Sequence, residues 1–330
     1  MGLSLQSLSS RLPKRDLISG FLVFLVALPL SLGIAMASGF PPVAGVLTAI
    51  VGGVLVSFLG SAPLTVKGPA AGLIVIVVGA VHELGGGDLA VGYRRTLAVG
   101  VVAALAQIAM ALAGAASLGA AMPPSIVHGM LAAIGVIIIA KQSHVVLGVS
   151  PAGDGPLELI GELPRSLAHE NPEILLIGAT SLLILFALPV LARRYRWVAS
   201  IPGPMLVVAV AVPLGLLFDL EHHHTYTFGG AVHDVGPRYL VNLSGRFVDA
   251  LAFPDFSAAF SLPSLKYAVM FTLVGSIEST LSVLAVDAMD PRRRASSLDR
   301  DLLAVGLGHL VAAAIGGLPM ISVIVRSRTN

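Results

Sequence analysis

The chain has 330 residues, 56% of them hydrophobic and only 12% charged, with a mean hydropathy of +0.92. This composition excludes an ordinary soluble globular domain and indicates a chain that lies mostly within a lipid bilayer. The formal net charge of +2 is too small and too scattered to indicate a nucleic-acid surface, and the lack of cysteine excludes disulfides and thiolate chemistry.

Long apolar runs follow a short polar segment, residues 1–15, and are the expected membrane-spanning helices. Most reach the roughly 20 residues that a helix needs to cross about 30 Å of hydrocarbon, and they lack the short alternation of a transmembrane β-barrel. The sequence therefore predicts an all-α, polytopic membrane protein. The expected spans cover about residues 16–37, 43–60, 68–81, 94–117, 124–141, 172–191, 201–218, 264–288 and 301–316, and a tenth begins near residue 320.

Arginines are concentrated between the sixth and seventh spans and between the eighth and ninth. They are Arg193, Arg194 and Arg196, and the run of residues 292–294. Loops rich in Lys and Arg remain on the cytoplasmic side of the membrane. This pattern predicts a cytoplasmic N-terminus.

Two stretches, residues 52–72 and residues 308–330, read as copies of each other. A shift of 256 positions superposes Gly52 on Gly308, Gly60 on Gly316 and Pro63 on Pro319. In each stretch an apolar helix ends at a small residue, a proline and a few extended residues follow, and an apolar run resumes. Seven spans separate the copies, so an inverted repeat is predicted. Paired breaks of this kind indicate the binding site of a transporter, although each alone could be a mere kink.

The helices that follow the two breaks are expected to begin near mid-membrane with their N-termini facing each other. Unpaired N–H groups and the helix dipole favour an anion there. Arg326, on the second of these helices, is expected inside the membrane, where its planar group suits an oxyanion; the alternatives are an arginine that snorkels or pairs with a carboxylate. Lys67 and Arg328 are further candidates, although Lys67 is also close enough to the cytoplasmic end to reach the surface.

Glu278 and Ser282 lie four residues apart on one face of the eighth span. A carboxylate beside hydroxyl oxygens suits Na⁺ or a proton, and the alternatives are a counter-ion for Arg326 or a helix-packing hydrogen bond. The histidine run at residues 222–224 resembles a metal site by composition, but it lies in a loop and does not predict one. No motif of an enzyme is present, so no catalysis is predicted.

The chain resembles the SulP family of inorganic anion transporters, the bacterial relatives of the solute carrier 26 proteins. The stretches that carry the resemblance are DLISGFLVFLVALPLSLGIAMASG (16–39), LTVKGPAAGLIV (64–75), IESTLSVLAVDAMDPRRR (277–294) and GGLPMISVIVRSRTN (316–330). The resemblance implies the uracil-permease type of fold, two inverted repeats of seven helices in which a core domain moves against a gate domain, in a bacterial inner membrane. It maps the core to about residues 16–117 and 264–330 and part of the gate to about residues 124–218.

The resemblance also implies the site. It places the anion between the third and tenth helices and a coupling Na⁺ at Glu278 and Ser282. The implied substrate-binding residues are Val66, Lys67, Gly68, Pro69, Ala70, Ala71, Ile321, Ser322, Val323, Ile324, Val325 and Arg326.

Two features depart from the family pattern. Val323 stands where many bacterial relatives have glutamate, which weakens the case for coupling through that side chain. The chain ends at Asn330, so helices eleven to fourteen and the STAS domain that follows them in relatives are expected to be absent. Transport by the truncated chain alone is not expected.

The expected function is secondary active transport of sulfate, bicarbonate or a related small oxyanion by alternating access, with cation coupling or exchange. The expected partners are the anion and the lipid bilayer, with Na⁺ as a candidate coupling ion and no other cofactor. The sequence leaves a homodimer open. The alternatives are an uncoupled anion channel or sensor, and a nucleobase:cation symporter of the same fold.

Overall fold

The computed structural model describes residues 14–117, 124–151, 153, 156–195, 198, 201, 203–241, 251–292 and 294–327. The chain divides into two compact units. Unit 1 comprises Met1–Pro124 and Gly245–Asn330, and unit 2 comprises Ser125–Ser244.

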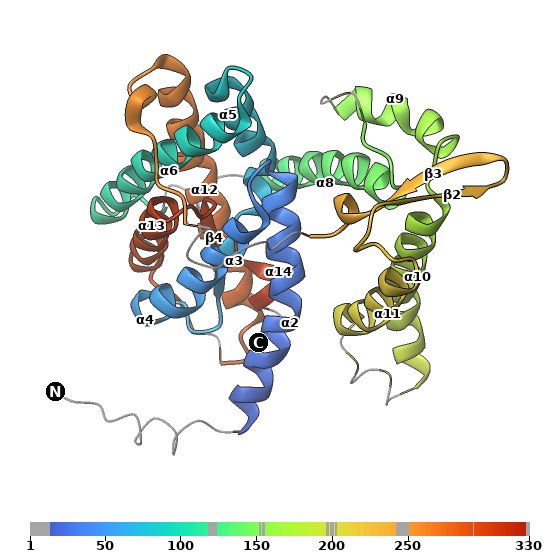
Figure 1. The fold of residues 1–330 in the computed structure, drawn as a ribbon. Helices are drawn as coiled ribbons and strands as arrows, with labels where there is room; N and C mark the ends of the chain where they lie inside the picture. The colour runs from blue at the N-terminus through green and yellow to red at the C-terminus, as the bar shows by residue number, and fades with distance from the viewer. Residues whose placement is uncertain are drawn as a thin grey trace. The chain divides into compact units, whose positions relative to one another are not determined.

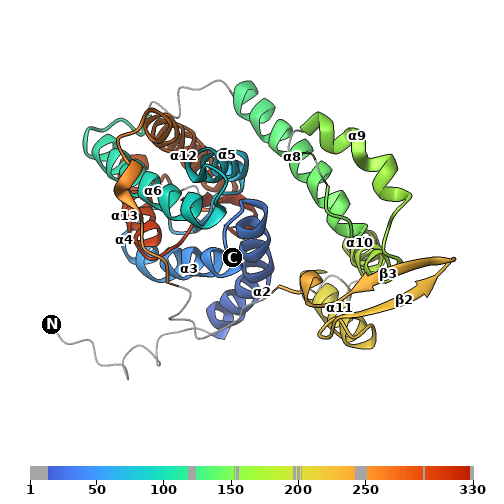
Figure 2. The same ribbon diagram turned by 45° about the horizontal axis from the view of Figure 1, so that its top comes forward.

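Unit 1 brings helices from the first third of the chain and from its last third together around a pair of short strands (Figures 1 and 2). Helix α6 packs against α5, α12 and α13, and α2 packs against α3. The main elements of unit 1 are α2 (Lys14–Ala37), α3 (Pro42–Val51), a π-helical turn (Gly52–Val56), α4 (Ser57–Leu59), β1 (Val66–Pro69), a 3-10 turn (Ala71–Leu73), α5 (Ile74–Gly85), α6 (Leu89–Leu112), α12 (Leu262–Met289), α13 (Leu298–Ala314), β4 (Met320–Val323) and α14 (Ile324–Ser327).

Local sequence signals explain several helix boundaries of unit 1. Helix α5 ends at Gly86, whose φ of 58° lies in the left-handed region that glycine adopts without strain. The Asp88 carboxylate then accepts hydrogen bonds from the N–H groups of Ala90 and Val91, at 2.8 and 3.1 Å, and begins α6. These two signals make a tight turn between two helices that pack side by side.

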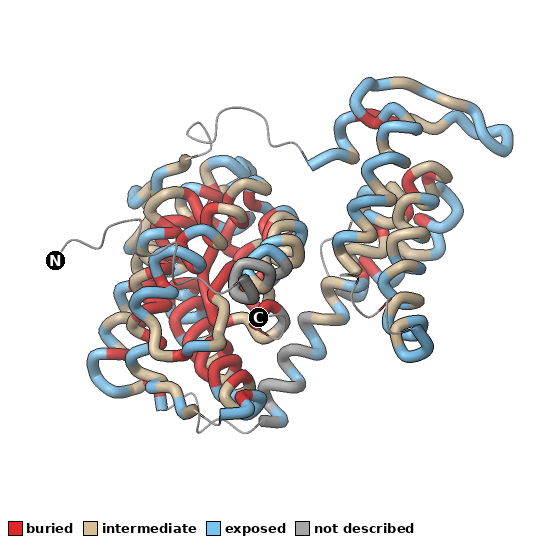
Figure 3. Tube along the Cα trace, turned by 90° about the horizontal axis from the view of Figure 1, so that it is seen from below, coloured by how far each residue is buried: buried red, intermediate tan, exposed pale blue. Residues whose placement is uncertain are grey.

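The core of unit 1 is apolar and surrounds the strand pair. Leu73, Val77, Leu97, Phe271 and Ile321 belong to one buried cluster to which β4 and helices α5, α6 and α12 contribute. Figure 3 shows buried residues gathered throughout this unit. Packing against the strands therefore fixes the helices around them.

The described residues of unit 2 form four α-helices, a β-hairpin and a short 3-10 turn (Pro237–Tyr239). Helix α10 packs against α11, and β2 pairs with β3 across a turn in which Gly229 and Gly230 both have positive φ. The elements are α8 (Pro124–Val146), α9 (Pro156–Leu167), α10 (Pro172–Arg194), α11 (Gly203–Leu217), β2 (His224–Phe228) and β3 (Ala231–Val235). The sequence predicted neither α9 nor the hairpin, because both lie in segments that were read only as connections between spans.

Five helical stretches of the described chain are long and apolar enough to cross a membrane, and three shorter apolar helices accompany them. The five are Ser19–Ala37, Pro42–Leu59, Leu89–Leu112, Pro172–Arg194 and Leu262–Met289, and the shorter ones are Ala71–Gly85, Gly135–Val146 and Gly203–Leu217. The largely helical, membrane-type fold is thus confirmed. Most of the expected spans correspond to helices, but the third begins as strand β1, with α5 starting only at Ile74, and the tenth begins as strand β4.

Candidate functional site

The two predicted breaks meet as an antiparallel strand pair. In β1 and β4, Val66 pairs with Val323 and Lys67 pairs with Ser322, and the pairing continues to Pro69 and Met320. Such pairing satisfies backbone groups that no helix can satisfy where the spans are interrupted. The β1–β4 crossing thus joins the first third of the chain to its last residues.

The register of this pair matches the sequence repeat. A shift of 256 positions carries Val66 to Ser322 and Lys67 to Val323, so the Val66–Val323 and Lys67–Ser322 pairs exchange with each other. Exchange of this kind is the property of a local two-fold axis that passes between the two strands. The larger inverted repeat remains a prediction, but its two copies run in opposite directions where they meet.

The matched glycines of the repeat make close contacts with the strands. A Cβ at Gly52 would lie 2.6 Å from the carbonyl oxygen of Lys67. A Cβ at Gly308 would meet the side chain of Val56 first and would lie 2.8 Å from the sulfur of Met320. Each glycine therefore allows its helix to contact the strand that follows it in the chain. This contact gives a physical reason for the repeated glycine.

Arg326 extends from α14 into the interior of unit 1 and is only 1% exposed. Its Nη2 donates a hydrogen bond to Oγ of Ser31 on α2, at 3.0 Å, and Nη1 lies against Gly68 of β1. A side chain at position 68 would occupy the place of the guanidinium. The structure thus places Arg326 against the first predicted break, while its position inside the membrane stays a prediction.

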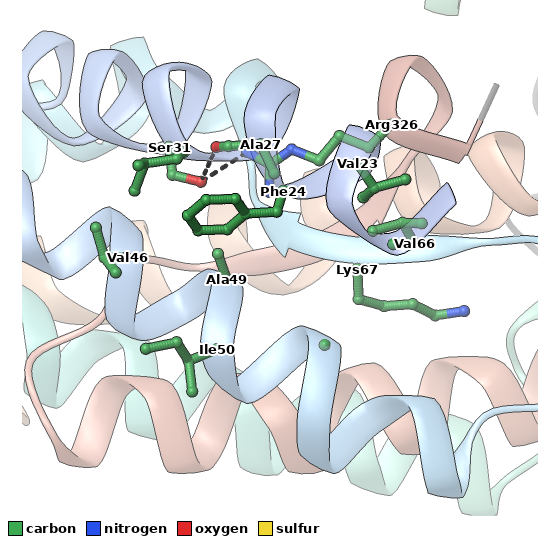
Figure 4. Close-up of a pocket in the computed structure, with 13 residues that line it drawn as sticks. Val23, Phe24, Ala27, Ser31, Val46, Ala49, Ile50, Val66, Lys67 and Arg326 are labelled. Atoms are coloured by element: carbon green, nitrogen blue, oxygen red, sulfur yellow. Dashed lines mark hydrogen bonds between the residues drawn. The ribbon is translucent and has the colours of Figure 1, made fainter. Parts of the chain in front are cut away.

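A cavity of about 230 Å³ lies beside Arg326, between α2, α3 and β1. Figure 4 shows Arg326 directed toward Ser31, and the Lys67 ammonium directed away from both. The other side chains around the cavity are apolar. They include Val23, Phe24, Ala27, Leu28, Val46, Ala49, Ile50 and Val66.

Lys67 forms an ion pair with Asp301 of α13, with 2.8 Å between Nζ and Oδ1. The two side chains are 3% and 2% exposed. Oδ2 of Asp301 accepts a hydrogen bond from Ser322 Oγ at 3.1 Å, and Ser322 accepts one from Ser279 Oγ of α12 at 3.2 Å. This network connects both strands to two helices, so the charge of Lys67 is balanced within the protein.

Glu278 and Ser282 are both buried on α12. The side chain of Glu278 packs against the start of the helical segment that follows β1. The Glu278 carboxylate contacts Gly72, and the N–H of Gly72 donates a hydrogen bond to it. Within the described part of the chain, Oε2 of Glu278 has no hydrogen-bond partner. This carboxylate is therefore placed against the 3-10 turn (Ala71–Leu73) that precedes α5.

The remaining predicted residues lie along the crossing. Gly68, Pro69, Ala70, Ile321 and Ser322 are buried, and Ala71, Val323 and Ile324 are half-buried. The side chain of Val325 and the whole of Arg328 lie outside the described residues.

Residues 14–330 match the sulfate permease family. The chain belongs to this family. The bicarbonate transporter BicA of Synechocystis is 25% identical over 303 residues, which cover 92% of this chain and 50% of that protein. The probable sulfate transporter Rv1739c of Mycobacterium tuberculosis is 23% identical over 312 residues, 93% of this chain and 51% of that one. The chain thus spans about half the length of the curated relatives it matches.

Solved structures of transporters of this family share the fold of the chain. The transmembrane domain of a cyanobacterial BicA aligns with a TM-score of 0.76 at 20% identity, covering 95% of this chain and 75% of that one. The overall structure of SLC26A9 aligns with a TM-score of 0.73 at 17% identity, covering 95% and 49%. This sulfate permease family protein is therefore an integral membrane protein with the fold of BicA and SLC26A9.

Three residues that contact the predicted site residues were not themselves predicted: Asp301, Ser279 and Ser31. Asp301 was detectable in principle, because a carboxylate in an apolar helical segment needs a partner. Ser31 and Ser279 carry no such signal, since serines in spans usually bond to their own helix, as Ser31 also does through the carbonyl of Ala27.

The histidine loop shows no metal site. His222 contacts Asp219 and His223 contacts Asp234, each at 2.7 Å. No group of three or more metal-ligating side chains occurs among the residues that the structure describes. The Asp219 carboxylate accepts a hydrogen bond from His222 and raises the pKa of that imidazole above its usual value.

Proposed function

We propose that the protein is a secondary active transporter of a small inorganic anion and that the β1–β4 crossing with its cavity is the anion site. The family supports the class of function, because the relatives are named as sulfate or bicarbonate transporters. In this proposal unit 1 is the core that moves against a gate to which unit 2 belongs, which gives alternating access.

The observation that carries the proposal is the position of Arg326. Its guanidinium lies beside a cavity of apolar side chains, against the backbone of Gly68 and within hydrogen-bond distance of Ser31. A planar group with five N–H donors suits a planar or tetrahedral oxyanion, and low dielectric strengthens the attraction.

Anion binding by the purified chain tests this site. We expect Arg326→Ala to weaken binding of bicarbonate or sulfate at least about tenfold, because a hydrogen bond to a charged group contributes about 1.5–3 kcal/mol. Arg238→Ala, at an exposed position just after the β2–β3 hairpin of unit 2, is the matched control and should bind normally. Calorimetry in lipid nanodiscs gives both affinities, and equal affinities for the Arg326→Ala variant and the parent chain would remove this residue from the site.

Coupling to a cation is the second part of the proposal. The unpaired Oε2 of Glu278 and the hydroxyl of Ser282, one turn further along α12, offer the oxygen ligands that Na⁺ prefers, and the carboxylate is also able to carry a proton. Uptake into proteoliposomes by a version extended to the full length of the relatives should therefore follow an imposed Na⁺ or proton gradient and lose that dependence in Glu278→Gln. Anion flux that is independent of both gradients and requires no counter-anion would instead indicate a channel.

The membrane orientation belongs to the same proposal. Arg193 and Arg194 end α10, and Arg292 and Arg294 lie in the connection after α12. Because loops rich in arginine remain in the cytoplasm, these positions support a cytoplasmic location for the C-terminal ends of α10 and α12. The N-terminus would then also be cytoplasmic, in a bacterial inner membrane. The absence of cysteine allows a single cysteine at position 292 to report its side by labelling with an impermeant maleimide. Labelling of this cysteine from the outside of intact cells would show that the orientation is the opposite of the one proposed.

A further inference from the structure

We infer that unit 2 binds a phospholipid with a zwitterionic head group. One acyl chain lies in an apolar groove between α8, α9 and α10, and the head group lies in a polar pocket on the adjoining face of α9. All residues of this site belong to unit 2, so the inference does not depend on the proposed function.

Helix α9 is fixed against α8 by buried hydrogen bonds, and the two helices lie alongside each other (Figure 2). Nε2 of His144 donates to the carbonyl oxygen of Leu159 at 3.0 Å, and Nδ1 of His144 and Oγ of Ser166 are 2.8 Å apart. The N–H of Asn171 donates to the carbonyl oxygen of Leu147 at 2.8 Å, which holds the end of α8 against the start of α10. The three helices therefore form a preformed frame around the groove.

The groove is a cavity of about 520 Å³. The wall from α8 includes the polar side chains of Gln142 and Ser143, and the rest of the lining that the structure describes is apolar, with Leu163 from α9 and Leu182 and Phe186 from α10. The last two lie about 15 and about 21 Å along α10 from its first residue. Because α10 is long and apolar enough to cross about 30 Å of hydrocarbon, they lie at the depth of acyl chains.

A second cavity, of about 290 Å³, lies at the C-terminal end of α9 and is polar. It is lined by the exposed Arg165 and His169 and by Glu162, so it presents charged groups of both signs. Oε1 of Glu162 accepts a hydrogen bond from the N–H of Gly153 at 3.1 Å, and a carboxylate has room for further donors. A zwitterionic head group fits this pair, because its phosphate suits the planar guanidinium and its ammonium suits the carboxylate.

The two cavities are placed as the two parts of one phospholipid. Leu163 and Leu167 line the groove, and Glu162, Ser166 and His169 line the polar pocket. Neighbouring residues of a helix point about 100° apart, so the two sets occupy adjoining faces of α9. The polar pocket is built from residues that directly precede α10, and the groove continues along α10. This order, polar at the end of a span and apolar along it, is that of a lipid in a bilayer.

Photolabelling of the purified chain in phosphatidylglycerol nanodiscs tests the inference. The probes are a phosphatidylethanolamine and a phosphatidylglycerol that each carry a diazirine at the end of one acyl chain, and the second probe lacks the ammonium. We expect the ethanolamine probe to label residues 139–146 and 182–186, about fivefold more than the glycerol probe does. Equal labelling of these segments by the two probes, or labelling spread evenly over the apolar helices, would overturn the inference.

Arg165→Gln removes the cation of the polar pocket and should lower labelling of the groove by the ethanolamine probe about fivefold. Arg194→Gln, at the opposite end of α10, is the matched control and should label as the parent chain does. Leu182→Trp fills the groove and should lower labelling while the polar pocket stays intact. Unchanged labelling in Arg165→Gln would overturn the inference, and the two probes on the parent chain decide it if that variant does not fold.

Discussion

The two units of this membrane protein treat their charged residues in opposite ways. In unit 1 the Lys67–Asp301 pair is 3% and 2% exposed, whereas in unit 2 the pair between Arg238 and Asp234, at the end of a β-hairpin, is 57% and 35% exposed. The spanning helix α10 of unit 2 has only 6% of its apolar window buried, against 56% for α12 in unit 1. Among the described residues, unit 1 thus places an ion pair at its centre, whereas the Arg238–Asp234 pair of unit 2 lies at the surface.

This difference indicates where the chain accepts an energetic cost. Taking two charges out of water costs several kcal/mol per ion, and the attraction between them offsets this cost only when the geometry and the remaining hydrogen bonds are good. In unit 1 the serines at positions 279 and 322 supply such bonds. A buried polar network at the meeting point of two interrupted spans is what a binding site needs and what a lipid-facing helix avoids.

The largest effect should come from breaking the buried pair. Asp301→Asn leaves the Lys67 ammonium uncompensated, and we expect it to reduce the free energy of unfolding by about 3–5 kcal/mol. Asp234→Asn in the exposed hairpin should cost at most about 1 kcal/mol. Unfolding of the two variants in the same detergent micelles compares these costs.

The double variant Lys67→Met, Asp301→Asn is the control for the first prediction. It removes both charges, so it should recover much of the stability that Asp301→Asn loses. If Asp301→Asn lowers the free energy of unfolding no more than Asp234→Asn does, the difference in burial between the two ion pairs does not affect stability.

A smaller effect is expected from filling the contact between the helix and the first strand. Gly52→Ala would place a Cβ 2.6 Å from the carbonyl oxygen of Lys67, so strand β1 must shift, at a cost of about 1–3 kcal/mol. Gly53→Ala is the adjacent control, because a Cβ at Gly53 meets nothing within 4 Å. Thermal unfolding should separate the two variants, and equal midpoints would contradict the close packing described for Gly52.

The smallest effect concerns the ion pair at the cytoplasm-facing end proposed for α12. The Arg294 guanidinium and the N–H groups of Arg292 and Arg294 hold the pKa of Asp290 at about 2, below its usual value of 3.8. Because the pKa is lower in the folded state, the pair stabilises the fold above pH 4, and this contribution is lost as the pH falls from about 4 to about 2. The difference in unfolding midpoint between the parent chain and Asp290→Asn should therefore shrink over this range, whereas a constant difference would argue against the pairing.

Much of unit 1 could be predicted from the sequence because its signals are local. Composition and run length indicate membrane helices, and the matched glycines and prolines of the two breaks identify the segments that become β1 and β4. The position of Arg326 beside Gly68 follows from joining these two signals. In unit 2, α9 and the β2–β3 hairpin were missed, because polar connections between spans show weak periodicity.

The sequence by itself determined which segments of this protein enter the membrane and where two of them are interrupted, since hydrophobic length and backbone-breaking residues act within a few turns of chain. Only the tertiary structure decided how the interruptions combine. The register of β1 on β4, the hydrogen bond from Arg326 to Ser31 and the ion pair between Lys67 and Asp301 join residues more than 200 positions apart. Such contacts depend on the packing of several helices at once, so no local pattern distinguishes a lysine that binds an anion from one whose charge is already balanced.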